Sequence, residues 1–180
     1  AVKRAAVLSR QEIEVMLARA KPRDRALIAL LTAGAMRVGE VTLLTWSDLD
    51  GRELTIPGGI TKTAHGRSFT LPSAACDAVQ EWKELCPETK GNWIFPGIAG
   101  KCLSVRAAQV AIGKLAEACG YVGVSSHSFR RSMLTAAHEA GYSLRQVAEI
   151  SGHQSLAALE RYLDQDVAKA KAEEARNLLF

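Results

Sequence analysis

The sequence predicts a mainly helical domain of the α+β class that contains a small antiparallel sheet of three strands. Two observations support this fold class. Helical patterns with their own start signals fill both ends of the chain, and a run of β-forming segments separated by turns lies between them, from 53 to 71. The length of 180 residues is that of one ordinary domain, so we expect residues 1–180 to share one hydrophobic core.

Start signals mark the first two helices. Ser9 and Glu12 make a capping box, which opens an amphipathic helix through about Ala20. Pro22 stands where a second helix would begin, and the segment RALIALLTA is apolar on most sides before Gly34 ends it. We therefore expect the second helix to be the buried spine of the core.

A short helix is expected over 38–44, and the sequence changes character after it. Turn-forming residues take over in SDLDGRE, and then the β-forming segments ELTI, GITKT and RSFTL follow. Pro57 with two glycines separates the first two segments, and AHG separates the last two. We expect the three segments to form the antiparallel sheet, with Lys62 in the middle strand close to a turn.

Helical patterns return after Pro72 and continue to the end of the chain. Apolar residues repeat at steps of three and four within 104–119, and a helix is also expected over 75–85. Three short helices follow: one from His127 capped by Ser126, one from the capping box of Ser143 and Gln146 to Gly152, and one from Ser155. We expect the tail at 166–180 to be a helix with few apolar anchors, and therefore mobile.

The composition of the chain excludes several classes of protein. Hydrophobic residues make up 48% and charged residues 23% of the chain, as in globular proteins, and no apolar run approaches the roughly 20 residues that cross a bilayer. The first residues do not read as a secretory signal, so we expect a cytoplasmic protein. The four cysteines show no metal-binding spacing, and the net charge of +4 favours an anionic partner.

Two motifs in the final third are candidates for chemistry. HSFRRS places His127 and Arg130 one turn apart at the start of a helix, where free N–H groups also favour an anion. A capping histidine and a solvated arginine would explain the same motif. SGHQSLAALERYLD places His153 at a helix boundary and Tyr162 near the end of the next helix, where an ordinary amphipathic tyrosine is the alternative.

Two other positions are ambiguous when they are taken alone. GAMRVGE puts Arg37 after a helix-ending glycine with Glu40 one turn on, an arrangement that a surface salt bridge would also explain. Lys62 lies close to a turn, and lysines in turns are ordinarily solvated. It is the order of the whole set that points to a function.

The set of residues, in this order, resembles the tyrosine recombinase family, also called phage integrases, whose catalytic domain runs arginine, hairpin lysine, H-x-x-R, G-H, tyrosine. The resemblance covers nearly the whole chain, from LSRQEIEVML through RDRALIALLTAGAMRVGEVTLLTWSDLD to the final motif. It implies the following catalytic residues: Arg37, Lys62, His127, Arg130, His153 and Tyr162. The sequence departs from the family pattern at Ala35-Met36 in place of Gly-Leu, at Arg131 in place of a histidine, and at Ser151 in place of a leucine.

The resemblance implies an enzyme that cuts double-stranded DNA and rejoins it through a 3′-phosphotyrosyl bond, without a cofactor or metal ion. Arg37 and Arg130 would stabilise the negative charge that develops on the phosphate oxygens, a role that metal ions have in other phosphoryl-transfer enzymes. His153 would hydrogen-bond a nonbridging oxygen. Glu40 would orient a nearby site residue and would not itself catalyse.

The proton transfers of this reaction fall to the remaining residues. A free tyrosine, with a pKa of about 10, is almost entirely protonated at neutral pH, so Tyr162 needs a base to become a nucleophile. The resemblance implies that His127 is this base. It also implies that Lys62, on a mobile hairpin, protonates the departing 5′-hydroxyl of the DNA.

Other functions remain open at the level of sequence. SLRQVAEISGHQSLAALERYLD also looks like a helix-turn-helix, so a DNA-binding regulator without catalysis is an alternative, although its second helix is poor in base-reading side chains. Type IB topoisomerases and telomere resolvases share the catalytic residues, so relaxation of supercoils is another. The family usually carries an N-terminal helical domain, which we expect this chain to lack, and self-association as a tetramer on DNA is expected of the full-length protein.

Overall fold

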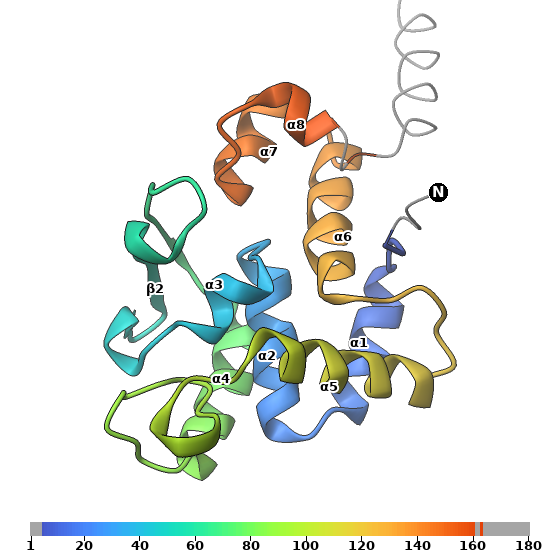
Figure 1. Cartoon of the computed structure of the whole chain (residues 1–180). Coiled ribbons are helices and arrows are strands. Elements are labelled where there is room, and N and C mark those ends of the chain that lie inside the picture. Colours follow the sequence, from blue (N-terminus) through green and yellow to red (C-terminus); the bar gives the residue numbers. More distant parts are fainter. Residues whose placement is uncertain (1–4, 161–162, 164–180) are drawn as a thin grey trace, which may run out of the picture.

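The computed structural model describes residues 5–160 and 163 and shows a mainly helical fold with a small sheet (Figure 1). The α-helices are α1 (Arg10–Arg19), α2 (Pro22–Ala33), α3 (Val38–Thr42), α4 (Ser73–Leu85), α5 (Val105–Ala118), α6 (Ser126–Glu139), α7 (Leu144–Ser151) and α8 (Leu156–Glu160). The strands are β1 (Leu49–Asp50), β2 (Glu53–Ile56) and β3 (Arg67–Thr70), and the 3-10 helices are η1 (Trp46–Asp48), η2 (Gly58–Ile60) and η3 (Ile98–Gly100). The predicted fold class is confirmed.

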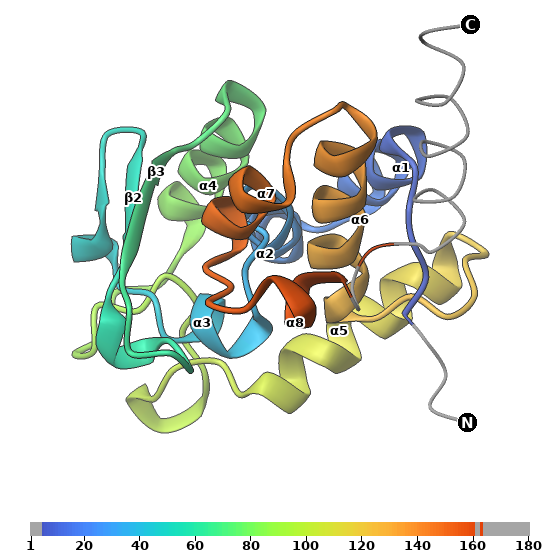
Figure 2. The same ribbon diagram turned by 90° about the horizontal axis from the view of Figure 1, so that it is seen from above.

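Helix α2 is the centre of the fold because its sequence is apolar on most sides. Its residues from Ala26 to Leu31 are all buried, and α2 packs against α1, α3, α4, α5 and α6. Figures 1 and 2 show these helices around α2, with the sheet at one side of the molecule. The prediction of a buried spine is confirmed, and so is the capping box of Ser9 and Glu12 that starts α1.

The sheet is antiparallel with the strand order β1-β2-β3. Residues of β2 alternate between exposed and buried, and Leu54 and Ile56 are the two that face the core. In β3, which pairs with β2 from Glu53↔Thr70 to Ile56↔Arg67, the half-buried positions are Arg67 and Phe69. The alternation therefore turns the charged side chain of Arg67 inward.

The prediction of a strand over 59–63 is wrong. This segment forms η2 and a turn, so Lys62 lies in the connection between β2 and β3 and not in a strand. A Cβ on Gly58 would lie only 2.7 Å from the carbonyl oxygen of Ala64, so the connection folds tightly on itself and does not pair with a neighbour. The third strand is β1, inside the segment predicted as a turn, and Gly51 with a φ of 57° turns the chain from β1 into β2.

The helices predicted between Pro72 and the end of the described residues are present, and the ends that can be compared differ by a residue or two. Helix α6 begins at Ser126 with Ser125 as its N-cap, one residue earlier than predicted. Helix α7 has the predicted capping box of Ser143 and Gln146 and ends at Gly152, which has a left-handed φ of 67°. The predicted tail helix at 166–180 lies outside the described residues.

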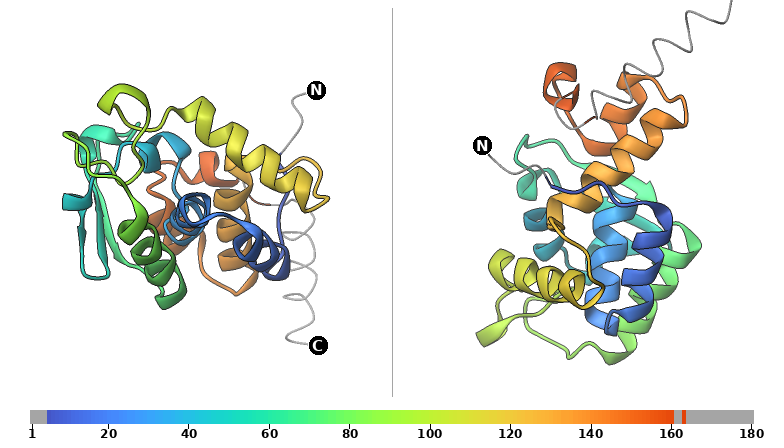
Figure 3. Two further views of the ribbon diagram at one scale, coloured as in Figure 1. Left: turned by 90° about the horizontal axis from the view of Figure 1, so that it is seen from below. Right: turned by 90° about the vertical axis from the view of Figure 1, so that its right-hand side faces the viewer.

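The buried side chains form two clusters. The larger one surrounds α2 and includes Leu54 of the sheet and Phe129 of α6. The smaller one joins α6, α7, α8 and the turn after α2, and it consists of Ala35, Leu134, Ala137, Val147, Ala148, Leu159 and Leu163. In Figure 3, α6 connects the end of the molecule that holds α7 and α8 to the rest. Helix α6 therefore contributes to both clusters.

Candidate active site

Arg130 lies on α6 between the two clusters, and its side chain is fully buried. Buried arginines are rare unless they are paired. The guanidinium of Arg130 donates from Nη1 to the carbonyl oxygen of Ala35 and from Nη2 to the carbonyl oxygen of Ser151, the latter at 3.1 Å. One side chain thus holds together α6, the turn after α2 and the end of α7.

The turn after α2 presents its carbonyl oxygens to the site. Ala35 has a φ of 43°, a left-handed conformation that glycine adopts without strain. This conformation is a physical reason for the glycine that the family usually has here. The carbonyl oxygen of Gly34 accepts from Nη2 of Arg67 at 3.4 Å, while that of Ala35 accepts from Arg130. The turn then leads directly to Arg37, the N-cap of α3.

Glu40 binds two arginines from different elements. Its Oε1 accepts from Nη1 of Arg37 at 3.1 Å, and its Oε2 accepts from the Arg37 backbone N–H at 3.0 Å and from Nη2 of Arg67 at 3.1 Å. Burial by itself would raise the pKa of the Glu40 carboxyl, but the Arg37 N–H and the charge of Arg67 together hold this pKa below its usual value. Glu40 is therefore an ionised carboxylate that fixes Arg37 to β3.

Arg67 is a site residue that the sequence did not reveal. Its side chain is 13% exposed, and its Nε is buried without a hydrogen-bond partner among the described residues. A Cβ added to Gly152 would lie 3.3 Å from Nη1 of Arg67, so this guanidinium also touches the turn that precedes His153. The available signal was the alternation of RSFT, which puts an arginine on the inward face of a strand.

His153 follows α7 and lies against Arg130. The Nη2 atom of Arg130 is 3.4 Å from Nδ1 and 3.3 Å from Nε2 of the ring, and the Ser151 hydroxyl is 2.5 Å from Nδ1. Burial first, and then the positive charges of Arg130, Arg37 and Arg67, lower the pKa of His153 to about 4, although Glu40 acts in the opposite direction. The imidazole is therefore neutral at neutral pH.

The remaining predicted residues are less constrained. His127 is exposed in the first turn of α6, and Lys62 is exposed in the β2–β3 connection. Neither side chain makes a hydrogen bond or ion pair with any residue in 5–160 or with 163. In Figure 1 the β2–β3 connection rises from the sheet toward the end of the molecule that holds α7 and α8. Tyr162 lies outside the described residues.

The structure thus brings together Arg37, Arg130 and His153 of the predicted set and adds Arg67 and Glu40 to them. Among the described residues, the charged groups that act on the His153 ring are three guanidiniums, of Arg130, Arg37 and Arg67, and the carboxylate of Glu40, so positive charge is in excess beside a neutral imidazole. Such a site suits a phosphate group, because guanidinium forks match phosphate oxygens and stay charged at all relevant pH values.

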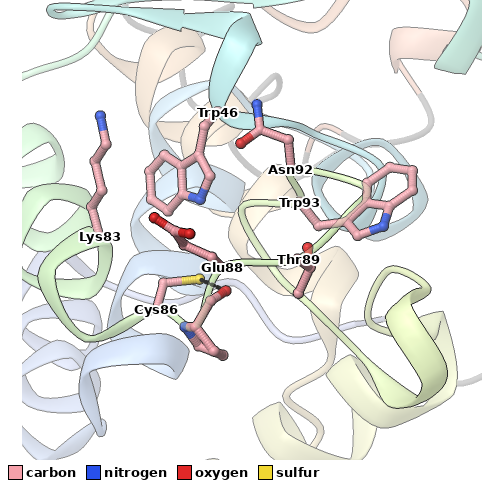
Figure 4. A pocket seen from close by; sticks show the side chains of 8 residues that line it. Trp46, Lys83, Cys86, Glu88, Thr89, Asn92 and Trp93 are labelled. Atoms are coloured by element: carbon pink, nitrogen blue, oxygen red, sulfur yellow. Dashed lines mark hydrogen bonds between the residues drawn. The ribbon is translucent and has the colours of Figure 1, made fainter.

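A separate pocket of about 330 Å³ lies beside the segment that follows α4 (Figure 4). Its lining includes Trp46 and Trp93, and the Lys83 ammonium is 5.3 Å from the centre of the Trp46 ring. No predicted site residue lines this pocket. Within the described ranges, no group of three or more His, Cys, Asp or Glu is placed to hold a metal ion, and no helix has the length and apolar character that crossing a membrane needs.

Sequence comparison finds relatives over most of the chain. A model of the Phage integrase family matches residues 6–169. The tyrosine recombinase XerC of Xanthomonas axonopodis pv. citri (strain 306) is 32% identical over 149 residues, which are 80% of this chain and 47% of that protein. The tyrosine recombinase XerC of Mycobacterium bovis (strain BCG / Pasteur 1173P2) is 32% identical over 157 residues, 83% of this chain and 52% of that protein. The chain spans about half the length of these curated relatives.

Solved structures share the fold. The crystal structure of XerA recombinase superposes with a TM-score of 0.80 at 20% identity and covers 95% of this chain and 63% of that one. XerH site-specific recombinase, bound to palindromic difH substrate in a post-cleavage complex, has a TM-score of 0.79 at 24% identity, with 96% of this chain and 52% of that one covered. The helical arrangement and the small sheet are therefore those of known recombinase cores.

Proposed function

The chain belongs to the phage integrase family, and from that premise we propose that it is the catalytic domain of a site-specific recombinase, which cuts double-stranded DNA and rejoins it through a 3′-phosphotyrosyl bond to Tyr162. The observation that supports this most is that Arg37 and Arg130 lie close to the neutral ring of His153 and make this site positively charged. No such assembly is needed by a protein that only binds DNA.

The two arginines of the proposed reaction stabilise its transition state. When the phosphodiester is attacked, negative charge spreads over its nonbridging oxygens, and catalysis depends mostly on placing positive groups around them. Arg130 is held rigidly by carbonyl oxygens and Arg37 by Glu40, so both are oriented before DNA arrives. Preoriented donors do not have to reorganise during the reaction.

The covalent step includes two proton transfers, one from the nucleophile and one to the leaving group. The Tyr162 oxygen attacks phosphorus, its proton passes to His127, the bond from phosphorus to the 5′-oxygen breaks, and Lys62 protonates that oxygen. The phosphotyrosyl bond retains the energy of the broken phosphodiester, so a 5′-hydroxyl of another strand reseals the DNA without ATP. The exposure of His127 and Lys62 in the structure is compatible with contact to a large substrate.

Several related structures contain DNA. XerH is described as bound to its difH substrate, and λ integrase as a dimer bound to a core site. We propose double-stranded DNA as the partner of this chain and tetrameric self-association on DNA for the full-length protein. Relaxation of supercoils, as by a type IB topoisomerase, would use the same cleavage step and differs only in which strand is rejoined.

The experiment that tests the function traps the covalent intermediate. The recombination site is first selected from a random-sequence library with the full-length protein, and a nicked suicide duplex carrying that site is then incubated with it. The parent protein should form a denaturant-resistant adduct in the presence of EDTA. Tyr162→Phe should bind DNA without an adduct, and Arg130→Ala should slow adduct formation by about a hundredfold to a thousandfold. A Tyr162→Phe variant that still forms the adduct would refute Tyr162 as the nucleophile. A parent protein that binds DNA without cleaving it would favour the alternative of a DNA-binding regulator without catalysis.

A further inference from the structure

The departure from the family pattern at Ser151 places a hydroxyl beside the site histidine. Ser151 is the last residue of α7 and is fully buried. A buried hydroxyl needs hydrogen-bond partners, and this one has three within reach. Its Oγ is 2.5 Å from Nδ1 of His153 and 3.2 Å from the carbonyl oxygens of Val147 and Ala148.

The hydroxyl has one proton to donate, and the distances indicate where it goes. The contact to Nδ1 of His153 is much shorter than either contact to a carbonyl oxygen. The carbonyl oxygen of Ala148 already accepts from the His153 backbone N–H at 3.1 Å. The distances therefore favour donation from the Ser151 hydroxyl to Nδ1 of His153.

We propose that Ser151 is a positioning residue whose hydroxyl donates to Nδ1 of His153 and thereby keeps the neutral ring in the tautomer that carries its proton on Nε2. A neutral imidazole has one N–H, so the position of that proton decides which nitrogen donates and which accepts. The Nη2 atom of Arg130 lies at nearly equal distances from Nδ1 and Nε2 and so does not select a tautomer.

The groups around the ring are consistent with a neutral imidazole. Arg130, Arg37 and Arg67 present positive charge to it, and Glu40 presents the opposing negative charge. With its pKa lowered to about 4, His153 has a single N–H throughout the neutral pH range. For the reaction, which this inference takes from the proposed function, an N–H on Nε2 is the form that can donate to a nonbridging phosphate oxygen.

The tautomer can be observed without DNA or catalysis. In the 180-residue chain labelled with ¹⁵N, two-bond spectra distinguish protonated from bare ring nitrogens for the four histidines, and His153→Gln identifies the signals of interest. At pH 7 the parent should show His153 with a bare Nδ1 and a protonated Nε2. A spectrum with the proton on Nδ1 would mean that Ser151 accepts, and it would overturn the proposal.

Substitutions test whether the Ser151 hydroxyl sets the tautomer of His153. Ser151→Ala should move His153 to a mixture of tautomers and slow single-turnover cleavage by about tenfold with unchanged DNA binding, a loss like that seen when a metal-binding histidine loses its orienting partner. Ser132→Ala is the matched control, because Ser132 is also buried on a helix but donates to the carbonyl oxygen of Ser128 at 2.7 Å. It should keep the parental tautomer.

A Ser151→Ala protein that keeps the parental tautomer would refute the proposal. If this variant does not fold, Ser151→Cys, with a similar shape and a weaker donor, replaces it, and the parent spectrum still decides. Absence of cleavage by the parent would count against the proposed function alone, since the tautomer is measured separately.

Discussion

Glu40 lies between Arg37 and Arg67, and both of its oxygens accept hydrogen bonds. Arg67→Leu should lower the free energy of unfolding by about 2 kcal/mol, because a buried carboxylate loses one charged partner. Urea denaturation measures this loss. Arg10→Leu is the control, since it breaks the Arg10–Glu14 pair, which is 93% and 58% exposed, and it should cost less than about 0.5 kcal/mol. Equal losses in the two variants would show that the Arg67 contact contributes little.

His153 should make stability depend on pH. In the unfolded chain its pKa is the ordinary 6.5, and in the folded protein it is about 4, so between these values the unfolded state binds more protons. The contribution of His153 to stability is therefore complete above about pH 6.5 and is lost as the pH falls toward 4.

Chemical denaturation at a series of pH values from 7 to about 4 checks this slope. His153→Gln should flatten it in this range, and His65→Gln, at an exposed histidine of the β2–β3 connection, is the control. A slope that survives His153→Gln would assign the titration to another group. Glu40, whose pKa is lowered, contributes stability that is lost only in more acidic solution.

Sequence patterns, through their resemblance to the recombinase family, singled out Arg37, Arg130 and His153, which the structure brings together. For Arg67 they offered only the alternation of RSFT, which turns the side chain inward, because its contacts arise from the tertiary placement of β3 against Glu40 and Gly152. Nor could they show that Arg130 is fully buried, since its carbonyl partners lie 95 and 21 residues away in the chain.

At the scale of elements, helices were predicted better than strands, and the reason is physical. The capping boxes at Ser9 and Ser143 are hydrogen bonds within one turn, so the local sequence suffices to place them. A strand of two residues such as β1 exists only because β2 pairs with it, and the sequence of β1 alone carries no such signal. The GITKT segment has β-forming residues but no neighbouring strand.

The β2–β3 connection offers a test of local strain. Ala64 is exposed and has a φ of 56°, which is unfavourable for a residue with a Cβ. Ala64→Gly should therefore raise the free energy of unfolding by about 0.5 kcal/mol. The same change at Ala136, exposed on α6, should lower it by about 1 kcal/mol. Thermal or urea denaturation measures both changes in the free energy of unfolding. An Ala64→Gly variant that is less stable than the parent would contradict the strain argument.

At the scale of the whole molecule, the site lies where the two hydrophobic clusters meet. The smaller cluster is built on the short helices α7 and α8, and the larger one contains the buried α2. Small units open at lower free energy than large cores. The free energy of the opening that exposes the amides of α7 to exchange should therefore be lower than that for α2 by at least roughly 2 kcal/mol. Native-state hydrogen exchange measures both. Equal opening energies would mean that the two clusters unfold as one.

Arg130 spans the junction of these clusters, and this position bears on affinity. Its bond to Ser151 exists only while α7 packs against α6, so the phosphate-binding geometry that we propose for the site belongs only to the molecules in which α7 is packed in this way. For the DNA binding that we propose, the apparent dissociation constant is the intrinsic constant divided by the fraction of molecules in which α7 is packed against α6. Substitutions in the smaller cluster that favour this packing should tighten the proposed DNA binding without adding a contact to DNA, and bound DNA should in turn stabilise the cluster.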